Sequence, residues 1–132
     1  MVALLEAAKE ARKNAYAPYS GYKVGAAVLD DRGRIHPGCN VESASFGATI
    51  CAERSAVARM IAEGGKEVKA VAVLTQDGGT PCGICLQVLS EFVKDPTKLE
   101  IFCAATDESQ KTFKLSELMP QPFRTDELKR TR

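Results

Sequence analysis

Residues 51–85, CAERSAVARMIAEGGKEVKAVAVLTQDGGTPCGIC, contain the pattern that decides the fold. The range 50–63 combines good helix formers with a repeating apolar face, and Gly64-Gly65 follows it, so a helix is predicted there. Residues 68–75 form an almost uninterrupted run of Val, Ala and Leu, which is typical of a strand covered on both faces. A loop leads into a second predicted helix over about 83–93. This helix–strand–helix order indicates an α/β fold.

The segments on either side add further strands and helices. Upstream, an amphipathic helix is predicted over 2–15, and a hairpin is predicted from strands over 22–29 and 34–39. Downstream, the pattern predicts a strand over 99–104, a short edge strand over 111–115, and a helical turn that Ser116 caps and that ends at Pro120. We therefore expect a three-layer α/β/α fold around a mixed sheet of roughly five strands.

The composition restricts the class of protein. A chain of 132 residues is expected to form one domain, here 1–132, and 45% hydrophobic residues are enough for a core. Its 18 basic and 17 acidic residues leave a net charge of +1, which gives no electrostatic reason to expect nucleic acid or an anionic membrane as a partner. The basic end, Lys129-Arg130-Thr131-Arg132, is interpreted as part of a solvated tail that starts at about residue 124.

The cysteine count and the N-terminus indicate a compartment. No apolar run approaches the roughly 20 residues that span a bilayer. Glu6, Lys9 and Glu10 interrupt the N-terminal apolar residues, so no signal peptide is expected. Five cysteines without an export signal are better explained as metal ligands and spare thiols than as disulfides. We expect a cytoplasmic protein.

Three cysteines have the spacing of a metal site. Cys51 precedes one predicted helix, and Cys82 and Cys85 begin the other. The free N–H groups and the positive dipole at a helix start favour thiolates. Three protein ligands leave one corner of a tetrahedral zinc ion open, which is typical of a catalytic site. The sequence therefore predicts a catalytic zinc site.

Two residues beside Cys51 have chemistry that suits such a site. Glu53 is not needed as a ligand, so its carboxylate can take a proton from water and pass it to a ring nitrogen and then to a departing amine. Arg54 is the expected donor of hydrogen bonds to the negatively charged sulfurs. Attack of water on an amidine carbon with loss of ammonia is hydrolytic deamination.

Other interpretations of the cysteines stay open at this point. A structural zinc could be closed by Cys39 or His36 as a fourth ligand in a non-catalytic binding module. Alternatively, Cys82-x-x-Cys85 could be a redox pair, although no thioredoxin-like context surrounds it. Cys103, inside an apolar strand, is expected to be an inert core residue, and His36 is expected to lie on the surface.

Further motifs accompany the cysteine segments over about Ala11 to Phe123. They are Ala17-Pro18-Tyr19-Ser20, Val24-Gly25-Ala26-Ala27, Gly38-Cys39-Asn40-Val41-Glu42, Ile50-Cys51-Ala52-Glu53-Arg54, Pro81-Cys82-Gly83-Ile84-Cys85 and Gln87-Val88-Leu89. With these motifs the chain resembles a cytidine deaminase of the small homotetrameric type, and Cys-x-Glu with Pro-Cys-x-x-Cys resembles the signature of zinc deaminases. The resemblance implies one zinc per chain on the three cysteines, Glu53 as the proton shuttle, a free nucleoside as substrate and a homotetramer.

The resemblance also implies roles in substrate binding. Asn40 and Glu42 are expected to hydrogen-bond the sugar 3′-hydroxyl, and side chains two residues apart on an extended segment do point the same way. Tyr22 stands where the family often has an aromatic residue, usually Phe, lining the pyrimidine pocket. Phe123 matches an aromatic residue that the family inserts into a neighbouring subunit's site. Complete active sites are then expected only in the assembled tetramer.

The chain departs from the family pattern at two positions. Leu86 follows Cys85 where the family usually has Arg, which leaves Arg54 as the expected cation beside the thiolates. Phe46, which we include among the predicted substrate-binding residues, stands where the family commonly has Tyr. The departures favour an alternative in which a deaminase of the same fold acts on another aminopyrimidine, such as an N4-substituted cytidine or a nucleoside antibiotic.

Overall fold

A five-stranded sheet in the order β2-β1-β3-β4-β5 forms the centre of the protein. The computed structural model describes residues 2–123, so the tail expected from about residue 124 lies outside it. The strands are β1 (Gly25–Asp30), β2 (Ile35–Cys39), β3 (Val68–Thr75), β4 (Glu100–Ala105) and β5 (Gln110–Lys114). β3 and β4 run parallel, and the other neighbouring strands are antiparallel, which confirms the predicted mixed sheet.

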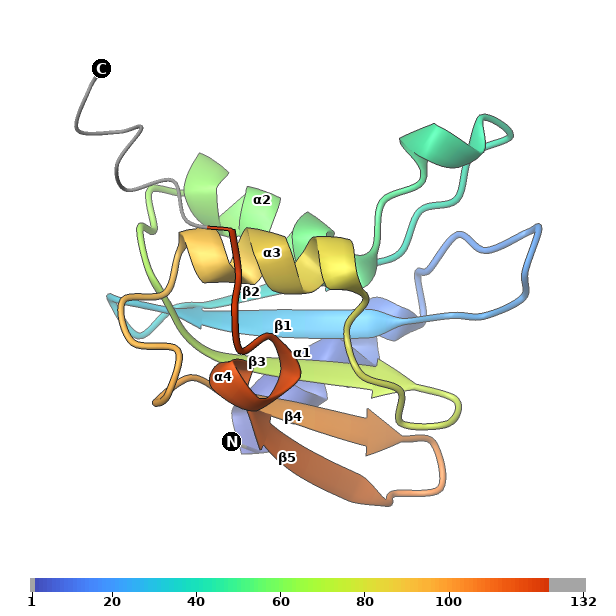
Figure 1. The fold of residues 1–132 in the computed structure, drawn as a ribbon. Helices are drawn as coiled ribbons and strands as arrows, with labels where there is room; N and C mark the ends of the chain where they lie inside the picture. Colours follow the sequence, from blue (N-terminus) through green and yellow to red (C-terminus); the bar gives the residue numbers. More distant parts are fainter. Residues whose placement is uncertain (1, 124–132) are drawn as a thin grey trace.

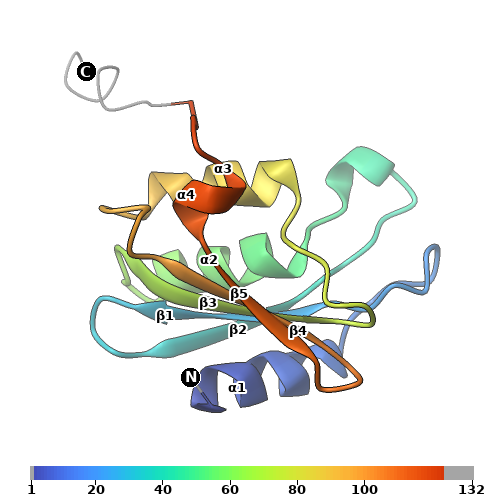
Figure 2. The same cartoon turned by 60° about the horizontal axis from the view of Figure 1, so that its bottom comes forward.

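Helices cover both faces of this sheet. They are α1 (Val2–Arg12), α2 (Ala52–Ala62), α3 (Gly83–Glu91) and α4 (Leu115–Leu118), with a 3₁₀ turn η1 (Phe46–Ala48) before α2. Figure 2 shows α1 on one side of the sheet and α2 and α3 on the other, so the three-layer prediction is confirmed. Within residues 2–123 no helix is long and apolar enough to span a membrane.

Three segments differ from their predicted form, and the first is α1, which ends at Arg12 rather than at residue 15. β1 starts at Gly25 rather than at residue 22, because the side chain of Asn40 replaces a ladder partner there: its Oδ1 accepts from Val24 N at 2.9 Å and its Nδ2 donates to Tyr22 O at 2.8 Å. The cap of α4 is Lys114 and not Ser116. The Glu117 carboxylate accepts a hydrogen bond from the Lys114 N–H at 2.7 Å, which satisfies a free donor at the helix start.

α2 lies directly on β2 because Gly38 has no side chain. A Cβ atom at Gly38 would lie 2.4 Å from Ala56 N and 2.7 Å from Ala52 O, both backbone atoms of α2. Small side chains on the helix, Ala52 and Ala56, are fully buried at this contact. This close approach fixes the height of α2 above the sheet, and with it the place of the residues at its N-terminus.

We expect Gly38→Ala to lower the free energy of unfolding by about 1–3 kcal/mol, because the added methyl group forces the α2 backbone away from β2. Urea unfolding followed by circular dichroism measures the change. Gly47→Ala is the matched control, since a Cβ there meets no heavy atom within 4 Å. Equal stability of the two variants would contradict the close approach.

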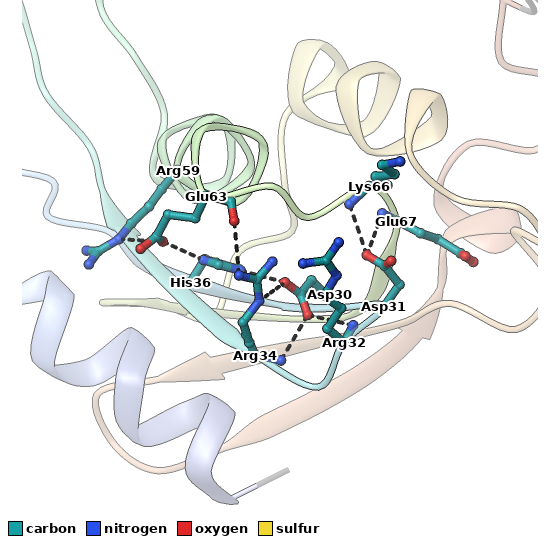
Figure 3. A network of polar contacts seen from close by, with 9 residues as sticks. All are labelled: Asp30, Asp31, Arg32, Arg34, His36, Arg59, Glu63, Lys66 and Glu67. Carbon is teal, nitrogen blue, oxygen red and sulfur yellow. Dashed lines mark hydrogen bonds and ion pairs between the residues drawn. The ribbon is translucent and has the colours of Figure 1, made fainter.

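A charged network joins the β1–β2 hairpin to the end of α2 (Figure 3). The prediction that His36 lies on the surface is wrong, because its side chain is buried between two carboxylates. Its Nε2 lies 2.8 Å from Asp30 Oδ2, and its Nδ1 lies 2.8 Å from Glu63 Oε2. Asp30 also accepts a hydrogen bond from Arg34 Nε at 2.9 Å. These long-range partners keep a polar ring in the interior, which sequence spacing alone does not reveal.

The network lowers the pKa values of its acids. Burial alone would raise the pKa of Asp30, but hydrogen bonds from His36 and from the backbone N–H groups of Arg34 and Arg32 hold it well below its usual range. The hydrogen bond with His36 is the main reason that the pKa of Glu63 is lowered. A carboxyl group with a depressed pKa in the folded state stabilises the fold above its unfolded pKa.

The stabilising effect of Asp30 is therefore expected at neutral pH and is expected to disappear as the pH falls through its lowered folded-state pKa. Asp30→Asn should reduce the urea midpoint at neutral pH, and its difference from the unchanged protein should shrink between about pH 5 and about pH 2. Glu6→Gln, which alters an exposed acid on α1, provides the control. A difference that stays constant over this range would contradict the ionised network.

Candidate active site

The three predicted cysteine ligands come together at the N-terminal ends of two helices. Cys51 is the N-cap of α2, Cys82 is the N-cap of α3, and Cys85 lies in the first turn of α3. Figure 1 shows these helix ends above the arrowhead end of β3. The Sγ atom of Cys82 lies 3.9 Å from that of Cys51 and 3.5 Å from that of Cys85. All three sulfur atoms lie within 4.8 Å of one another.

This spacing fits a tetrahedral zinc ion. Zinc–sulfur bonds of about 2.3 Å at tetrahedral angles place two sulfurs about 3.8 Å apart. Among residues 2–123, these cysteines form the one group of at least three His, Cys, Asp or Glu side chains close enough to hold a metal. Neither Cys39 nor His36 belongs to the group, and the ring of His36 is bound to Asp30 and Glu63. The cluster thus offers three side chains that could hold a metal ion, which is the number of protein ligands typical of a catalytic site.

The surroundings favour a thiolate on Cys51. Hydrogen bonds from Cys85, and then from Arg54 and Cys82, outweigh burial and lower the pKa of Cys51 to about 5. The hydrogen bond with Cys51, and then burial and the negative charges of Glu53 and Cys51, raise the pKa of Cys85. Three thiols this close can all lose their protons only with a cation among them, and a metal ion bound by the three sulfurs would be that cation.

Arg54 is the cation that contacts the cluster. Its Nη2 donates to Thr49 O at 3.2 Å and to Cys51 Sγ at 3.7 Å, as expected for a residue that supports the ligands. Leu86 is buried in the hydrophobic core between α3 and the sheet, with Leu89 and Ile101. Leu86, which stands where the family usually has Arg, therefore places an apolar side chain in the core. Among the described residues, Arg54 alone provides positive charge at the sulfurs.

Glu53 is buried beside the cysteines. Only 5% of it is exposed, and it lies in the first turn of α2, two residues after Cys51. Burial, and then the negative charge of Cys51, raise the pKa of Glu53 to about 7. Within residues 2–123, no side-chain hydrogen bond contributes to this shift. It is placed to exchange protons with a molecule in the adjacent pocket.

A pocket of about 250 Å³ opens beside Glu53 and the sulfurs. Its walls come from the segment before β1, the end of β2, the start of α2 and the β3–α3 loop. The lining residues are Ser20, Tyr22, Val24, Asn40, Glu42, Thr49, Cys51, Ala52, Glu53, Val73, Thr75, Gly79, Thr80 and Cys82. The structure therefore brings three of the predicted binding residues, Tyr22, Asn40 and Glu42, to the same cavity as Glu53.

Asn40 and Glu42 are held in place by the neighbouring backbone. Asn40 is buried and bridges Tyr22 and Val24 through its amide. Glu42 Oε1 accepts from the N–H groups of Tyr19 and Ser20 at 3.0 and 3.1 Å, and its Oε2 accepts from the Ser20 hydroxyl. Hydrogen bonding to Ser20 lowers the pKa of Glu42, so its carboxylate is ionised. Each side chain keeps hydrogen-bonding capacity for a ligand.

Phe46 and Phe123 lie outside this pocket. Phe46, on η1, is 78% exposed and contacts Tyr19 edge-on, with ring centroids 6.3 Å apart. The ring of Phe123 is 68% exposed, although its backbone is fixed by the Gln87 amide through bonds of 2.9 and 3.2 Å. A single chain therefore does not bring either ring to the cavity.

Sequence reasoning missed two polar residues of the pocket region. Thr75 ends β3 and lines the cavity, and Asp77 follows it in the β3–α3 loop. The sequence signal that could have found them is their position just after a predicted strand, because ligands of α/β sheets bind beyond the carboxyl ends of the strands. Neither residue belongs to a motif, so spacing alone did not single them out.

Comparison with known proteins gives the family. Residues 2–99 match the family described as the cytidine and deoxycytidylate deaminase zinc-binding region. A cytidine deaminase of Halalkalibacterium halodurans is 39% identical over 127 residues, which cover 95% of this chain and 95% of that protein. The chain belongs to the cytidine deaminase family. A cytidine deaminase of Mycobacterium tuberculosis is 40% identical, with 95% of this chain and 90% of that protein covered.

A solved structure agrees with this family. The cytidine deaminase of Burkholderia pseudomallei matches with a TM-score of 0.85 and 43% identity, over 92% of this chain and 98% of that chain. The predicted fold is therefore confirmed as that of cytidine deaminases. Family and fold also make the chain a hydrolytic deaminase with zinc as its cofactor, and the three cysteines fit that metal.

Proposed function

We propose that this cytidine deaminase family member converts cytidine and 2′-deoxycytidine to the uridine nucleosides and ammonia, as in pyrimidine salvage. The observation that carries the proposal is the convergence of Glu53, Cys51 and Cys82 on one pocket of about 250 Å³, with Cys85 in the same sulfur cluster. Relatives named cytidine deaminase over nearly the whole chain support this substrate. We assign Cys51, Cys82 and Cys85 as the zinc ligands.

The reaction needs a proton carrier at the pyrimidine ring. Cys51, Cys82 and Cys85 would hold the zinc, which would lower the pKa of bound water, to about 7 in favourable sites, and so supply a nucleophile. The Glu53 carboxylate takes a proton from the attacking water, delivers it to the ring nitrogen N3, and then carries a proton to the amine that leaves from C4. Water and cytidine thus give uridine and ammonia, and Glu53 returns to its starting state. Arg54 holds the Cys51 sulfur in place by its hydrogen bond.

The sugar end of the pocket suits a free nucleoside. Asn40 and Glu42 offer an amide and an ionised carboxylate to the 3′-hydroxyl. The described lining residues include no Lys, Arg or His that would pair with a phosphate. A phosphate placed beside the Glu42 carboxylate would also be disfavoured by like-charge repulsion.

A substrate panel tests this function. Zinc-loaded protein is given cytidine, 2′-deoxycytidine, cytidine monophosphate, cytosine and N4-methylcytidine, and the products are separated by chromatography. We expect turnover of the two nucleosides and none of the monophosphate. Turnover confined to N4-methylcytidine would instead support the alternative specificity, which Phe46 motivates from the sequence.

We infer that the protein assembles as a homotetramer in which aromatic residues complete neighbouring sites. Exposed apolar side chains support this, among them Tyr19, Phe46, Ile50 and Phe123. The anchored backbone and free ring of Phe123 suit insertion into another copy. Light scattering after size exclusion is expected to give four chains, and a monomer with full activity would refute the assembly.

A cytoplasmic location is the compartment we propose. All five cysteines are free thiols in the structure, including Cys82, which is exposed. Clustered thiolates that must stay reduced to bind a metal suit a reducing environment. Free nucleosides as substrates agree with this compartment.

A further inference from the structure

Tyr22 and Asp77, which are 55 residues apart, connect two walls of the pocket. The Tyr22 hydroxyl donates a hydrogen bond of 2.6 Å to Asp77 Oδ1. Tyr22 lies in the segment before β1, whereas Asp77 lies in the β3–α3 loop that leads to Cys82. The contact therefore ties the aromatic wall of the pocket to the loop that carries a zinc ligand.

Asp77 is itself fixed from several sides. Its Oδ1 also accepts from the Thr75 hydroxyl and from Gly79 N, each at 3.2 Å. Thr75 Oγ1 accepts from Gly78 N at 2.7 Å, which holds the loop in its turn. The backbone of Asp77 forms a bridge with Ala105 at the end of β4. The carboxylate is thus a rigid acceptor at the carboxyl ends of β3 and β4.

Tyr22 is held at its backbone as well as at its hydroxyl. Its N–H donates to Ser20 Oγ at 3.0 Å, and its C=O accepts from Asn40 Nδ2 at 2.8 Å. Ser20 in turn donates to Glu42. A continuous polar chain therefore runs around the pocket from Glu42 through Ser20 and Tyr22 to Asp77. Neither Tyr22 nor Ser20 is free to move independently of the residues proposed to hold the sugar.

We propose that Asp77 is a positioning residue for the pyrimidine ring, acting through the hydroxyl of Tyr22. The bond holds the phenol ring as one wall of the pocket at a fixed distance from the loop before Cys82. Gly79 permits this placement, because a Cβ there would lie 3.3 Å from the Tyr22 oxygen. The inference rests on the proposed nucleoside substrate, and it adds a residue that the family motifs do not contain.

The charge states agree with this geometry. The hydrogen bond from Tyr22 is the main cause that lowers the pKa of Asp77. Burial, and then the bond to Asp77, raise the pKa of Tyr22, so the phenol keeps its proton and donates it. A neutral hydroxyl on an ionised carboxylate is among the stronger hydrogen bonds. Because Tyr22 is 36% exposed, solvent moderates the expected effect.

Steady-state kinetics on four zinc-loaded variants test the positioning role. Tyr22→Phe keeps the ring and removes the hydroxyl, Asp77→Ala removes the acceptor, Asp77→Asn keeps an acceptor oxygen, and the fourth variant combines Tyr22→Phe with Asp77→Ala. We expect each of the first two to raise KM for cytidine about fivefold with kcat within about twofold. The combined variant should equal the single ones, and Asp77→Asn should restore most of the loss.

Thermal unfolding of the same variants provides a readout that does not depend on activity. The combined variant should unfold at the temperature of Asp77→Ala, because both changes remove the Tyr22–Asp77 contact and Asp77→Ala also removes the bonds from Thr75 and Gly79. Additive KM effects would overturn the positioning role. An unchanged KM in Tyr22→Phe and Asp77→Ala, together with a lowered unfolding temperature, would also overturn it and leave a structural role. If the unchanged protein turned over no nucleoside, the proposed function would fail. If the unchanged protein were active but the variants did not share one KM effect, only the positioning role of Asp77 would fail.

Discussion

Replacing Glu53 by alanine is expected to lower kcat for cytidine by about 10²- to 10⁴-fold, while zinc content and fold remain unchanged. The carboxyl group is buried beside the sulfurs and lines the pocket, yet it is not among the metal-ligating group. Its loss therefore removes proton transfer without removing a ligand. Uridine formation measures turnover, and metal analysis with circular dichroism checks zinc and fold.

Glu10→Ala is the matched control for this experiment, because it removes an exposed acid on α1, on the opposite face of the sheet. It should retain full turnover. Glu53→Gln adds a variant of nearly the same shape that cannot carry the proton. Substantial activity in both Glu53 variants, with zinc still bound, would remove Glu53 from the mechanism.

Removal of one cysteine ligand is expected to have the second large effect. Cys85→Ala should reduce zinc from about one ion per chain to almost none and abolish turnover, because two thiolates with no third ligand bind the metal far more weakly. Cys85 is buried and its sulfur lies 3.5 Å from that of Cys82. Metal analysis after dialysis against a weak chelator measures the loss.

Two other cysteines serve as controls for the ligand set. Cys103→Ala alters a buried thiol in β4, and Cys39→Ala alters a half-buried thiol at the end of β2. Both variants should keep one zinc per chain, since neither sulfur belongs to the cluster. Loss of zinc in Cys39→Ala alone would support a closed structural site with a fourth protein ligand, contrary to the catalytic assignment.

Much of the fold follows from local pattern. The apolar run of β3 was predicted with both of its ends, because Val, Ala and Leu continue from Val68 to Thr75 and polar loops flank them. α2 and α3 were predicted within a few residues of their bounds from their apolar faces and the glycines after residue 63. In these segments the short-range preference and the tertiary structure agree.

The differences arise where distant residues replace local partners. β1 begins late because the Asn40 side chain bonds the backbone at residues 22 and 24. His36 is interior because Asp30 and Glu63 meet both ring nitrogens. Neither arrangement has a periodic signature, so only the assembled fold reveals it.

The residues of the candidate site also fall into those that sequence spacing predicts and those that only the structure reveals. Cys51, Glu53 and the Cys82–Cys85 pair were found from spacing, because metal chemistry restricts residue type and order. Asp77 was not predicted, because a single carboxylate in a loop forms no motif with its sequence neighbours. Its partner Tyr22 also lies far away in the sequence. Residues that act through another residue need the three-dimensional structure to be recognised.

The most direct measurement is the formation of uridine and ammonia from cytidine by the purified protein, in zinc-loaded and zinc-free form. We predict equal amounts of the two products from the zinc-loaded protein, and turnover that disappears without zinc and returns when zinc is restored. Cytidine left unchanged by protein that holds one zinc on Cys51, Cys82 and Cys85 would contradict this prediction.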